Sequence, residues 1–572
     1  MMPKLLVTIC AFFILNLVVW SAKGTARAQT PSAVPTASPS AAPTNVTPSA
    51  APASATPPAL PLIATPAQLA LPPGQPTSIA VTGGSGAITA AFDNRIARID
   101  IDQTSRTVTL TAIVTRATAT LHISDQTGQT IDVRLRVAPN AGTIPKSITV
   151  KLTGDSIDSN FVASQITLAL LRETQVQMGA VPSFGPIQFL GQALTPGGVA
   201  NLAIPVTISG GDQYLDVSDT TNIRVQNVSA TPFSPTLLFF SDDPEHIVSD
   251  GVLARATLSA QQPIRLYDYH ENGLQPRRLV LAFSSAAPSS VHVIESFAGP
   301  NMDVMTVGHV VTRNFLTYKP HNVGTIVDLN ADVPILYRDV AMGPRDGVAN
   351  NVDLRVLSGG PVTVTVLAVS AGIAPATLLN APKVPGDTHN RQGVFPLTGF
   401  GQHVLQYQVG AEEPSVDIGD REPTLPDIDP KIAGHDYGDY GVLHQMSIKM
   451  NNPTDQPAPI YLFMLPRGGP VRSTYLIDND TVPFELGCVR AQNPVARYLL
   501  RSYTLPARGT LQSRILTMAE GGSNYPITIG VSAVAPQPTA PPIFSPTGCF
   551  PKPQQAPPPP STSATPSPLP TP

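Results

Sequence analysis

The sequence predicts a mostly β fold, in which β-sandwich domains follow one another in tandem, with one small α+β segment and disordered, proline-rich ends. Apolar side chains recur at every second residue in many short segments, as they do in strands with one buried face. A chain of 572 residues is too long for a single core, so it divides into several domains. The 63 prolines and 42 glycines are too many for a helical protein.

Residues 1–28 have the three parts of a secretory signal peptide. They contain a basic Lys4, an apolar run that ends at Trp20, and a small-residue cleavage site that ends at Ala28. The run is short for a membrane helix, so we expect cleavage and no membrane span in the mature chain. A retained segment would instead anchor the protein, with Lys4 inside the cell. Either way the sequence predicts a secreted protein or one of the cell surface or envelope.

Residues 29–64 and 536–572 are predicted to be a linker and a tail, because both consist mainly of Pro, Ala, Ser and Thr. Such segments cannot bury enough apolar surface to fold, and proline stiffens them into extended spacers. Residues 411–432 form a second linker, which is acidic and has no apolar period.

Residues 65–139 form the first predicted domain. In residues 130–137, Ile131, Val133 and Leu135 alternate with polar neighbours, which predicts a strand with one buried face. Asp125-Gln-Thr-Gly128 precedes this strand, and a glycine there can adopt the positive φ of a hairpin loop. Several short strands at this spacing predict a small β-sandwich.

The run Ala117-Thr-Ala-Thr-Leu-His-Ile-Ser-Asp-Gln-Thr-Gly-Gln-Thr-Ile-Asp-Val and the closing Val137-Ala-Pro resemble the bacterial immunoglobulin-like (Big-type) domains of exported surface proteins. The resemblance covers residues 65–139 only. It implies a bacterial protein and an Ig-like module that is structural or adhesive rather than catalytic.

Three further folded segments follow. Residues 140–209 are predicted to form the small α+β segment, whose helix has Phe161 and Leu170 on one face and Asp158 or Ser159 as its cap. Residues 210–410 predict a β-sandwich region, either one large domain or two small ones, with a helix at 301–316 and a hairpin at Gly359-Gly360. Residues 433–535 predict a C-terminal β-sandwich.

The predicted export places the cysteines in an oxidising compartment. Of three in the chain, Cys10 leaves with the signal, so Cys488 and Cys549 remain and are predicted to form a disulfide. The alternative is a pair of free thiols that lie too far apart to react.

Charge and motifs argue against two classes of function. A net charge of -4 gives no basic stripe for a phosphate backbone, so we expect no nucleic-acid partner. The sequence has no GxSxG, HExxH, P-loop or GxGxxG pattern. We therefore expect no catalytic residues and no enzyme, although two distant carboxylates of a glycosidase would leave no such pattern.

Two clusters mix carboxylates, imidazoles and tyrosines, which can bind a metal or a sugar. They cover residues 242–246 with 267–272, and residues 435–440. The simpler interpretation is that these are turn residues at the edges of sandwiches. The candidate metal ligands are Asp243, Glu245, His246, Asp268, His270, His435 and Asp439.

The acidic linker adds one cofactor hypothesis. Its carboxylates are hard oxygen ligands and could hold calcium between two domains, whereas charge runs are usually only solvated. No other cofactor is expected. The carboxylates concerned are Glu412, Glu413, Asp417, Asp420, Glu422, Asp427 and Asp429.

Three functional hypotheses follow from these features. The first is a non-enzymatic surface or secreted protein that binds an extracellular polysaccharide or protein, or builds the envelope. The second is a secreted carbohydrate-active hydrolase, for which Asp243, Glu245 and Asp439 are the residues to substitute, with the Ig-like module as an accessory. The third is an envelope assembly factor whose edge strands pair with another chain.

Overall fold

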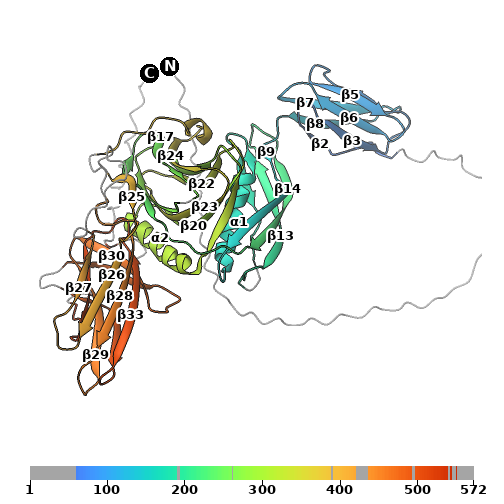
Figure 1. The fold of residues 1–572 in the computed structure, drawn as a ribbon. Helices are drawn as coiled ribbons and strands as arrows, with labels where there is room; N and C mark the ends of the chain where they lie inside the picture. Colours follow the sequence, from blue (N-terminus) through green and yellow to red (C-terminus); the bar gives the residue numbers. More distant parts are fainter. Residues whose placement is uncertain are drawn as a thin grey trace, which may run out of the picture. The chain divides into compact units, whose positions relative to one another are not determined.

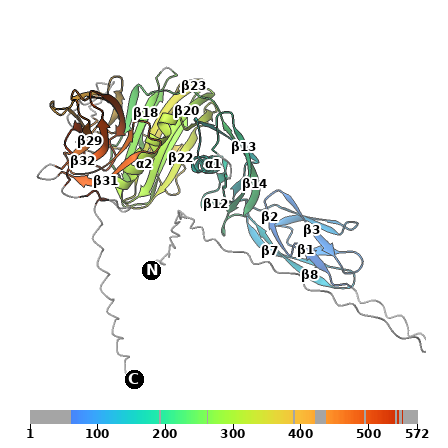
Figure 2. The same ribbon diagram turned by 90° about the horizontal axis from the view of Figure 1, so that it is seen from below.

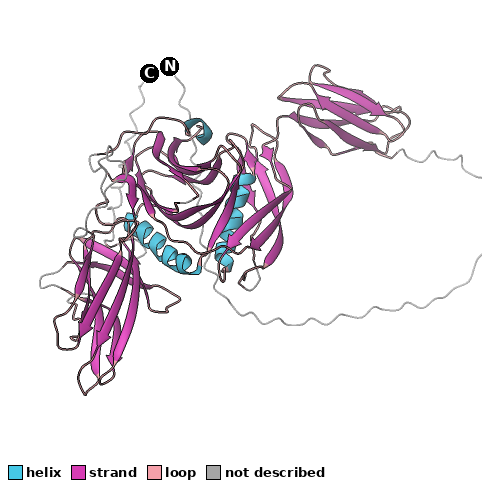
Figure 3. Cartoon of the chain, viewed as in Figure 1, coloured by secondary structure: helices cyan, strands magenta, loops and turns pink. Residues whose placement is uncertain are grey.

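The computed structural model describes residues 60–189, 193–260, 262–387, 391–419, 436–491, 496–538, 541–543 and 549. The predicted signal peptide lies outside these ranges, as do His435 and most of the predicted linkers and tail. The described chain is mostly β, as the sequence predicts (Figure 3). Within the described ranges, neither α-helix has the length and apolarity needed to cross a membrane.

The first domain is a sandwich of two sheets, in the orders β1-β3-β6-β5 and β2-β8-β7-β4 (Figure 1, blue). Leu110, Leu121 and Val133 fill its core without exposed surface. The predicted hairpin is present between β7 and β8, and Gly128 has a φ of +83° there. Its strands are β1 (Ile63–Thr65), β2 (Gln68–Leu71), β3 (Pro76–Thr82), β4 (Thr89–Ala91), β5 (Ala97–Asp102), β6 (Thr107–Ala112), β7 (Ala117–Ser124) and β8 (Thr130–Val137).

The central region contains an 11-stranded sheet in the order β12-β13-β14-β10-β21-β20-β23-β18-β15-β25, with β16 pairing beside β18. Its strands are β10 (Ser147–Thr153), β12 (Val181–Phe184), β13 (Val199–Ser209), β14 (Val217–Asn227), β15 (Leu237–Ser241), β16 (His246–Ile247), β18 (Ile264–Asn272), β20 (Ser289–Asn301), β21 (Gly324–Leu329), β23 (Gly347–Ser358) and β25 (Gln392–Pro396).

This sheet changes the predicted division at residue 210. That position falls within the hairpin of β13 and β14, and β10 pairs with β14 in parallel and with β21 in antiparallel fashion. Residues 140–209 are therefore part of one sheet with residues 210–410. Local periodicity did not reveal this, because the strand pairs that join the two segments are far apart in sequence.

A second sheet, β17-β24-β19-β22, covers one face of the large sheet. It consists of β17 (Gly251–Leu258), β19 (Arg277–Ser284), β22 (Ile335–Met342) and β24 (Val362–Ser370). The predicted hairpin at Gly359-Gly360 is wrong, because β23 and β24 lie in different sheets. The chain crosses between the sheets at Gly359, where φ is +94° and a Cβ would lie 2.2 Å from the carbonyl oxygen of Pro288.

Two helices pack on the central region. Helix α1 (Ser159–Glu173) begins at Asp158, whose carboxylate accepts hydrogen bonds from the backbone of Asn160 and Phe161. Helix α2 (Val304–Tyr318) begins at Asp303, later than the predicted 301, because Asn301 still belongs to β20. It lies along β20 and β23 (Figure 2), on the opposite side of the large sheet from β17 and β24 (Figure 1). A two-stranded ribbon of β9 (Gly142–Thr143) and β11 (Gln175–Val176) lies beside α1.

The C-terminal domain is a sandwich of the sheets β26-β28-β33-β30-β31 and β27-β34-β29-β32. It begins earlier than the predicted residue 433, because β26 and β27 belong to it. In the predicted acidic linker, Val416 and Ile418 therefore form part of a strand that packs on the core. The strands are β26 (Gln402–Gln408), β27 (Ser415–Ile418), β28 (Leu443–Asn451), β29 (Ala458–Pro466), β30 (Pro470–Ile477), β31 (Phe484–Arg490), β32 (Tyr498–Leu505), β33 (Thr510–Met518) and β34 (Ile527–Ser532).

Candidate functional site

The two halves of the first candidate cluster lie side by side. Strands β15 and β18 pair in parallel, which places Ser241 beside Asp268, and β16 places His246 beside Glu271. The side chains differ strongly in exposure. Asp268 and His270 have no exposed surface and Asp243 is 1% exposed, whereas His246 faces solvent. The predicted metal ligands of this cluster are therefore split between the interior and the surface.

Ser241, His270 and Asp268 contain the residue types of a nucleophilic triad but not its geometry. The Ser241 hydroxyl lies 3.0 Å from His270 Nε2, and Asp268 Oδ1 lies 3.1 Å from the same nitrogen. In a triad the serine and the carboxylate bind different ring nitrogens. His270 Nδ1 instead lies 2.8 Å from the carbonyl oxygen of Pro244, to which it donates. All three side chains are without exposed surface, so the cluster is not an open reaction centre.

Asp242 and Asp243 lie between β15 and β16, and they connect this segment to the residues just before β25. Arg391 Nε lies 3.3 Å from Asp242, and the same guanidinium bonds Glu245. The backbone N–H of Asp387 donates to Asp243, and the N–H of Glu245 donates to Asp387 over 3.1 Å. Burial raises the pKa of Asp242 well above its usual range, Arg391 opposes the shift, and the neighbouring carboxylates add to it. These acidic side chains therefore hold the segment between β15 and β16 against the residues before β25.

The second candidate cluster lies against the first. The Tyr440 and Tyr267 rings have centroids 6.0 Å apart, and the Tyr440 hydroxyl donates to the carbonyl oxygen of Ser523 over 2.6 Å. Asp436 and Asp439 are buried, and burial together with the charge of Asp439 raises the pKa of Asp436 well above its usual range. His435 is outside the described residues. The two clusters thus meet where the central region joins the C-terminal sandwich.

The described residues give a metal ion no evident site. Among these residues there is no group of three or more His, Cys, Asp or Glu side chains placed to hold a metal. In the acidic run, Glu413 forms an ion pair with Arg497 over 2.7 Å, and Asp417 accepts a hydrogen bond from Thr528. Both contacts fix β27 within the C-terminal sandwich. The carboxylates from Asp420 to Asp429 lie outside the described residues, so calcium binding there stays a prediction.

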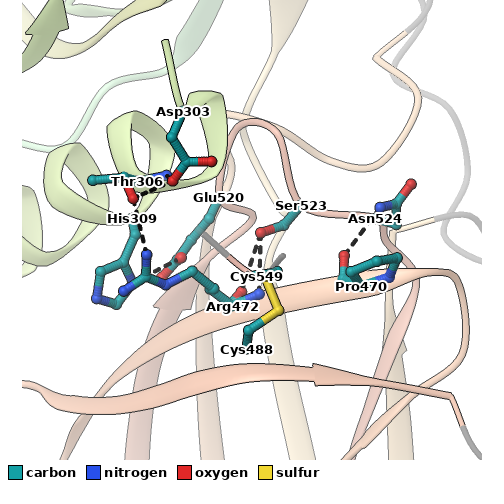
Figure 4. The surroundings of a disulfide bond; sticks show 10 residues. All are labelled: Asp303, Thr306, His309, Pro470, Arg472, Cys488, Glu520, Ser523, Asn524 and Cys549. Atoms are coloured by element: carbon teal, nitrogen blue, oxygen red, sulfur yellow. Dashed lines mark hydrogen bonds and ion pairs between the residues drawn. A yellow bond between two sulfur atoms is a disulfide. The ribbon is translucent and has the colours of Figure 1, made fainter. Parts of the chain in front are cut away.

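A charged network that the sequence analysis did not predict centres on His309 of helix α2 (Figure 4). Its Nδ1 lies 2.9 Å from Glu520, and its Nε2 lies 2.6 Å from Glu485. The hydroxyl of Thr474 donates to the other oxygen of Glu520 over 2.6 Å. Burial lowers the pKa of His309, but the two carboxylates outweigh it and hold the pKa above its ordinary value.

Helix α2 also touches the C-terminal sandwich through its backbone. Gly308 faces Gly521 so closely that a Cβ on Gly308 would lie 2.0 Å from the Gly521 carbonyl oxygen. No local pattern could have predicted this contact or the His309 network, because the partners are far apart in sequence and become neighbours only after both domains have folded.

Cys488 and Cys549 are joined by a disulfide near this contact (Figure 4). Met305 of helix α2 packs against both sulfur-bearing side chains. Just before Cys549, Ile543 pairs with Cys488 through two backbone hydrogen bonds of 2.8 and 2.9 Å. The disulfide and this short pairing hold the beginning of the tail on the edge strand β31.

No family model and no curated protein matches the chain. Partly similar solved structures include domains 5–6 of the S-layer protein SbsC, with 12% identity over 30% of this chain and 98% of that one and a TM-score of 0.14. Drosophila N-cadherin EC1-3 shows 12% identity over 29% of this chain and 68% of that one, with a TM-score of 0.12. The chicken CNTN1 FN1–FN3 domains show 9% identity over 53% of this chain and 98% of that one, with a TM-score of 0.11. Such scores are too low for these likenesses to decide fold or function.

Proposed function

We propose that the mature chain is an exported, non-enzymatic protein, secreted or held at the cell surface or envelope of a bacterium, that binds an extracellular polysaccharide or protein. One observation carries this proposal. Most of the acidic, imidazole and tyrosine side chains that could have served chemistry are buried: Asp268 and His270 within the central region, and Tyr267 against Tyr440 of the C-terminal sandwich. A network of this kind fixes domains and offers no open reaction centre.

The disulfide between Cys488 and Cys549 supports the compartment. Structural disulfides persist outside the cytoplasm and are rare inside it. Together with the signal sequence of residues 1–28, this favours export. The Ig-like character of residues 65–139, taken from the resemblance above, belongs to the same proposal and favours a structural or adhesive module.

The outer face of the first domain is the surface that best suits a polar polymer. A hollow of about 750 Å³ lies over β2, β7 and β8 and reaches Asp216. Gln68 and Thr120 flank Arg134 on adjacent strands, so hydrogen-bonding groups form a row across the sheet. An extended polysaccharide or polypeptide presents matching hydroxyls or amides to such a row.

The experiment is a binding assay with product analysis, using the mature chain from residue 29 and extracellular polysaccharides or surface proteins. We expect binding without turnover, and Arg134→Ala should weaken it by at least about tenfold, since a hydrogen bond to a charged group contributes about 1.5–3 kcal/mol. Arg98→Ala is the matched control, because Arg98 is exposed on the other sheet of the same domain. Cleavage of a glycan or peptide that Asp243→Asn abolishes in a folded protein would overturn the proposal.

A further inference from the structure

Strand β26 differs from the other edge strands of five or more residues in the described chain. It pairs only with β28 there and forms one edge of its sheet. Edge strands invite pairing with another chain, and proteins usually protect them with charged residues, proline or a covering segment. The longer edge strands have such protection: Arg98, Asp100 and Asp102 in β5, Arg255 in β17, Arg338 and Asp339 in β22, Arg501 in β32, Pro396 in β25, and the paired Ile543 beside β31. Strand β26, Gln-His-Val-Leu-Gln-Tyr-Gln, has no charged residue and no proline.

The backbone of β26 has a defined free side. Gly401 accepts a hydrogen bond from Gln445 over 2.6 Å, and Val409 donates to Asn451 over 2.9 Å, so the odd-numbered residues bond β28. The even-numbered residues from Gln402 to Gln408 therefore direct their N–H and C=O groups away from β28, and the C=O of Gln408 accepts a hydrogen bond from the N–H of Ala411 over 2.9 Å. Their side chains are exposed on the outer face, and Val404 is 72% exposed.

We propose that β26 pairs with β26 of a second copy of this chain, in antiparallel fashion, with the two-fold axis at Leu405. This register places Val404 opposite Gln406, where both backbone hydrogen bonds can form, and Gln402 opposite Gln408, where the N–H of Gln408 can donate to the C=O of Gln402. It keeps the buried side chains of Leu405 and Tyr407 on the core face in both copies.

Charge favours the same partner. Because β26 carries no formal charge, two copies meet without repulsion, whereas β5 would bring its own aspartates together. A two-fold pair of identical edges also closes the sheet, so assembly stops at a dimer. An interface of one strand pair is small, so the dimer is expected to be weak and to depend on protein concentration. This inference does not depend on the proposed ligand.

Sedimentation of the mature chain over a range of concentrations tests the proposal. Val404→Lys places a charge at the centre of the pairing face and should raise the dissociation constant of the dimer at least about tenfold. Val482→Lys is the matched control, since Val482 is also 72% exposed but lies outside every strand, and it should leave dimerisation unchanged. A wild-type chain that stays monomeric throughout, or a Val404→Lys chain that dimerises equally well, overturns the proposal.

Cross-linking tests the register independently of any effect of lysine on folding. The double variant Val404→Cys/Gln406→Cys places a cysteine opposite a cysteine of the partner and should form a covalent dimer under oxidising conditions. Either single variant should not, because each cysteine would then face an unchanged residue. Equal cross-linking of the single variants, or β26 amides whose exchange protection does not change with protein concentration, would refute pairing in this register.

Discussion

His309 offers the sharpest test of how the C-terminal sandwich is held on helix α2. Its imidazole bonds Glu520 over 2.9 Å and Glu485 over 2.6 Å. Replacing it by glutamine removes the positive charge and at least one of the two contacts. Glu520 has no exposed surface, so its carboxylate would remain buried with Thr474 as its main partner.

The expected loss is about 2–3 kcal/mol. A hydrogen bond to a charged group contributes about 1.5–3 kcal/mol, and the buried contact with Glu520 accounts for most of the effect. The contact with Glu485 adds less, because 35% of that side chain is exposed and water screens the interaction. Opening of helix α2 should therefore become about 30- to 150-fold more frequent in His309→Gln.

The same contact predicts a pH dependence. The docked pKa of His309 is raised above its ordinary value, so the docked state binds a proton more tightly than the open state. The stability that protonated His309 adds to docking is fully present below the ordinary pKa of histidine, about 6.5, and is lost as the pH rises through the raised pKa. Arg472 opposes the shift, and Arg313 lies 3.8 Å from Glu485. Docking should thus weaken toward alkaline pH in the wild type and not in His309→Gln.

Hydrogen exchange, resolved for residues 304–318 and 519–523 and corrected for intrinsic rates, measures this opening directly. His122→Gln is the control, because His122 bonds Asp132 over 2.6 Å while both side chains are more than half exposed. It should change stability by less than about 0.5 kcal/mol. If His309→Gln exchanges like the control, or if the wild-type protection is flat from pH 6 to 9, the electrostatic account of this contact is wrong.

Three further substitutions should have definite effects. Cys549→Ser opens a disulfide loop with a sequence separation of 61, and denaturant unfolding should show a loss of about 4 kcal/mol in the C-terminal sandwich. Gly308→Ala would favour an isolated helix by about 1 kcal/mol, but here its Cβ would collide with the Gly521 carbonyl, so thermal melting should show destabilisation. Asp353→Asn leaves Arg265 without its carboxylate partner, and calorimetry should show a loss of about 3–5 kcal/mol in the central region.

Local features of the fold were predictable where one stretch of sequence determines them. Residues 130–137 alternate strictly and form β8, and Asp158 caps helix α1 as its position before an apolar face predicts. Pairing between distant strands was not predictable in this way. Strands β23 and β24 are buried on both faces, although β23 carries Asn350, Asn351 and Asp353, so their sequences do not show which neighbours they have.

The candidate site was predictable in its residue types but not in their role. Asp268 and His270 lie two residues apart on a strand, and the pattern cannot tell whether their shared face is solvent or core. In the structure this shared face points into the core, so Asp268 and His270 are buried hydrogen-bonding groups rather than accessible ligands. The role of His309 was not predictable, because helix periodicity indicates that the position is buried but not that Glu485 and Glu520 lie beside it.

These buried polar groups explain why the two domains adopt one arrangement. An apolar contact tolerates small shifts, whereas a buried donor or acceptor that loses its partner costs several kcal/mol. Two such contacts cross between the domains, Arg265 on the carbonyl oxygen of Gly441 over 3.1 Å and His309 on Glu520, and both fail together if the C-terminal sandwich shifts. The net stability from such contacts is modest, but their directions select a single geometry. Buried charged and polar side chains, here His309 and Arg265, thus set the position of the C-terminal sandwich on the central region.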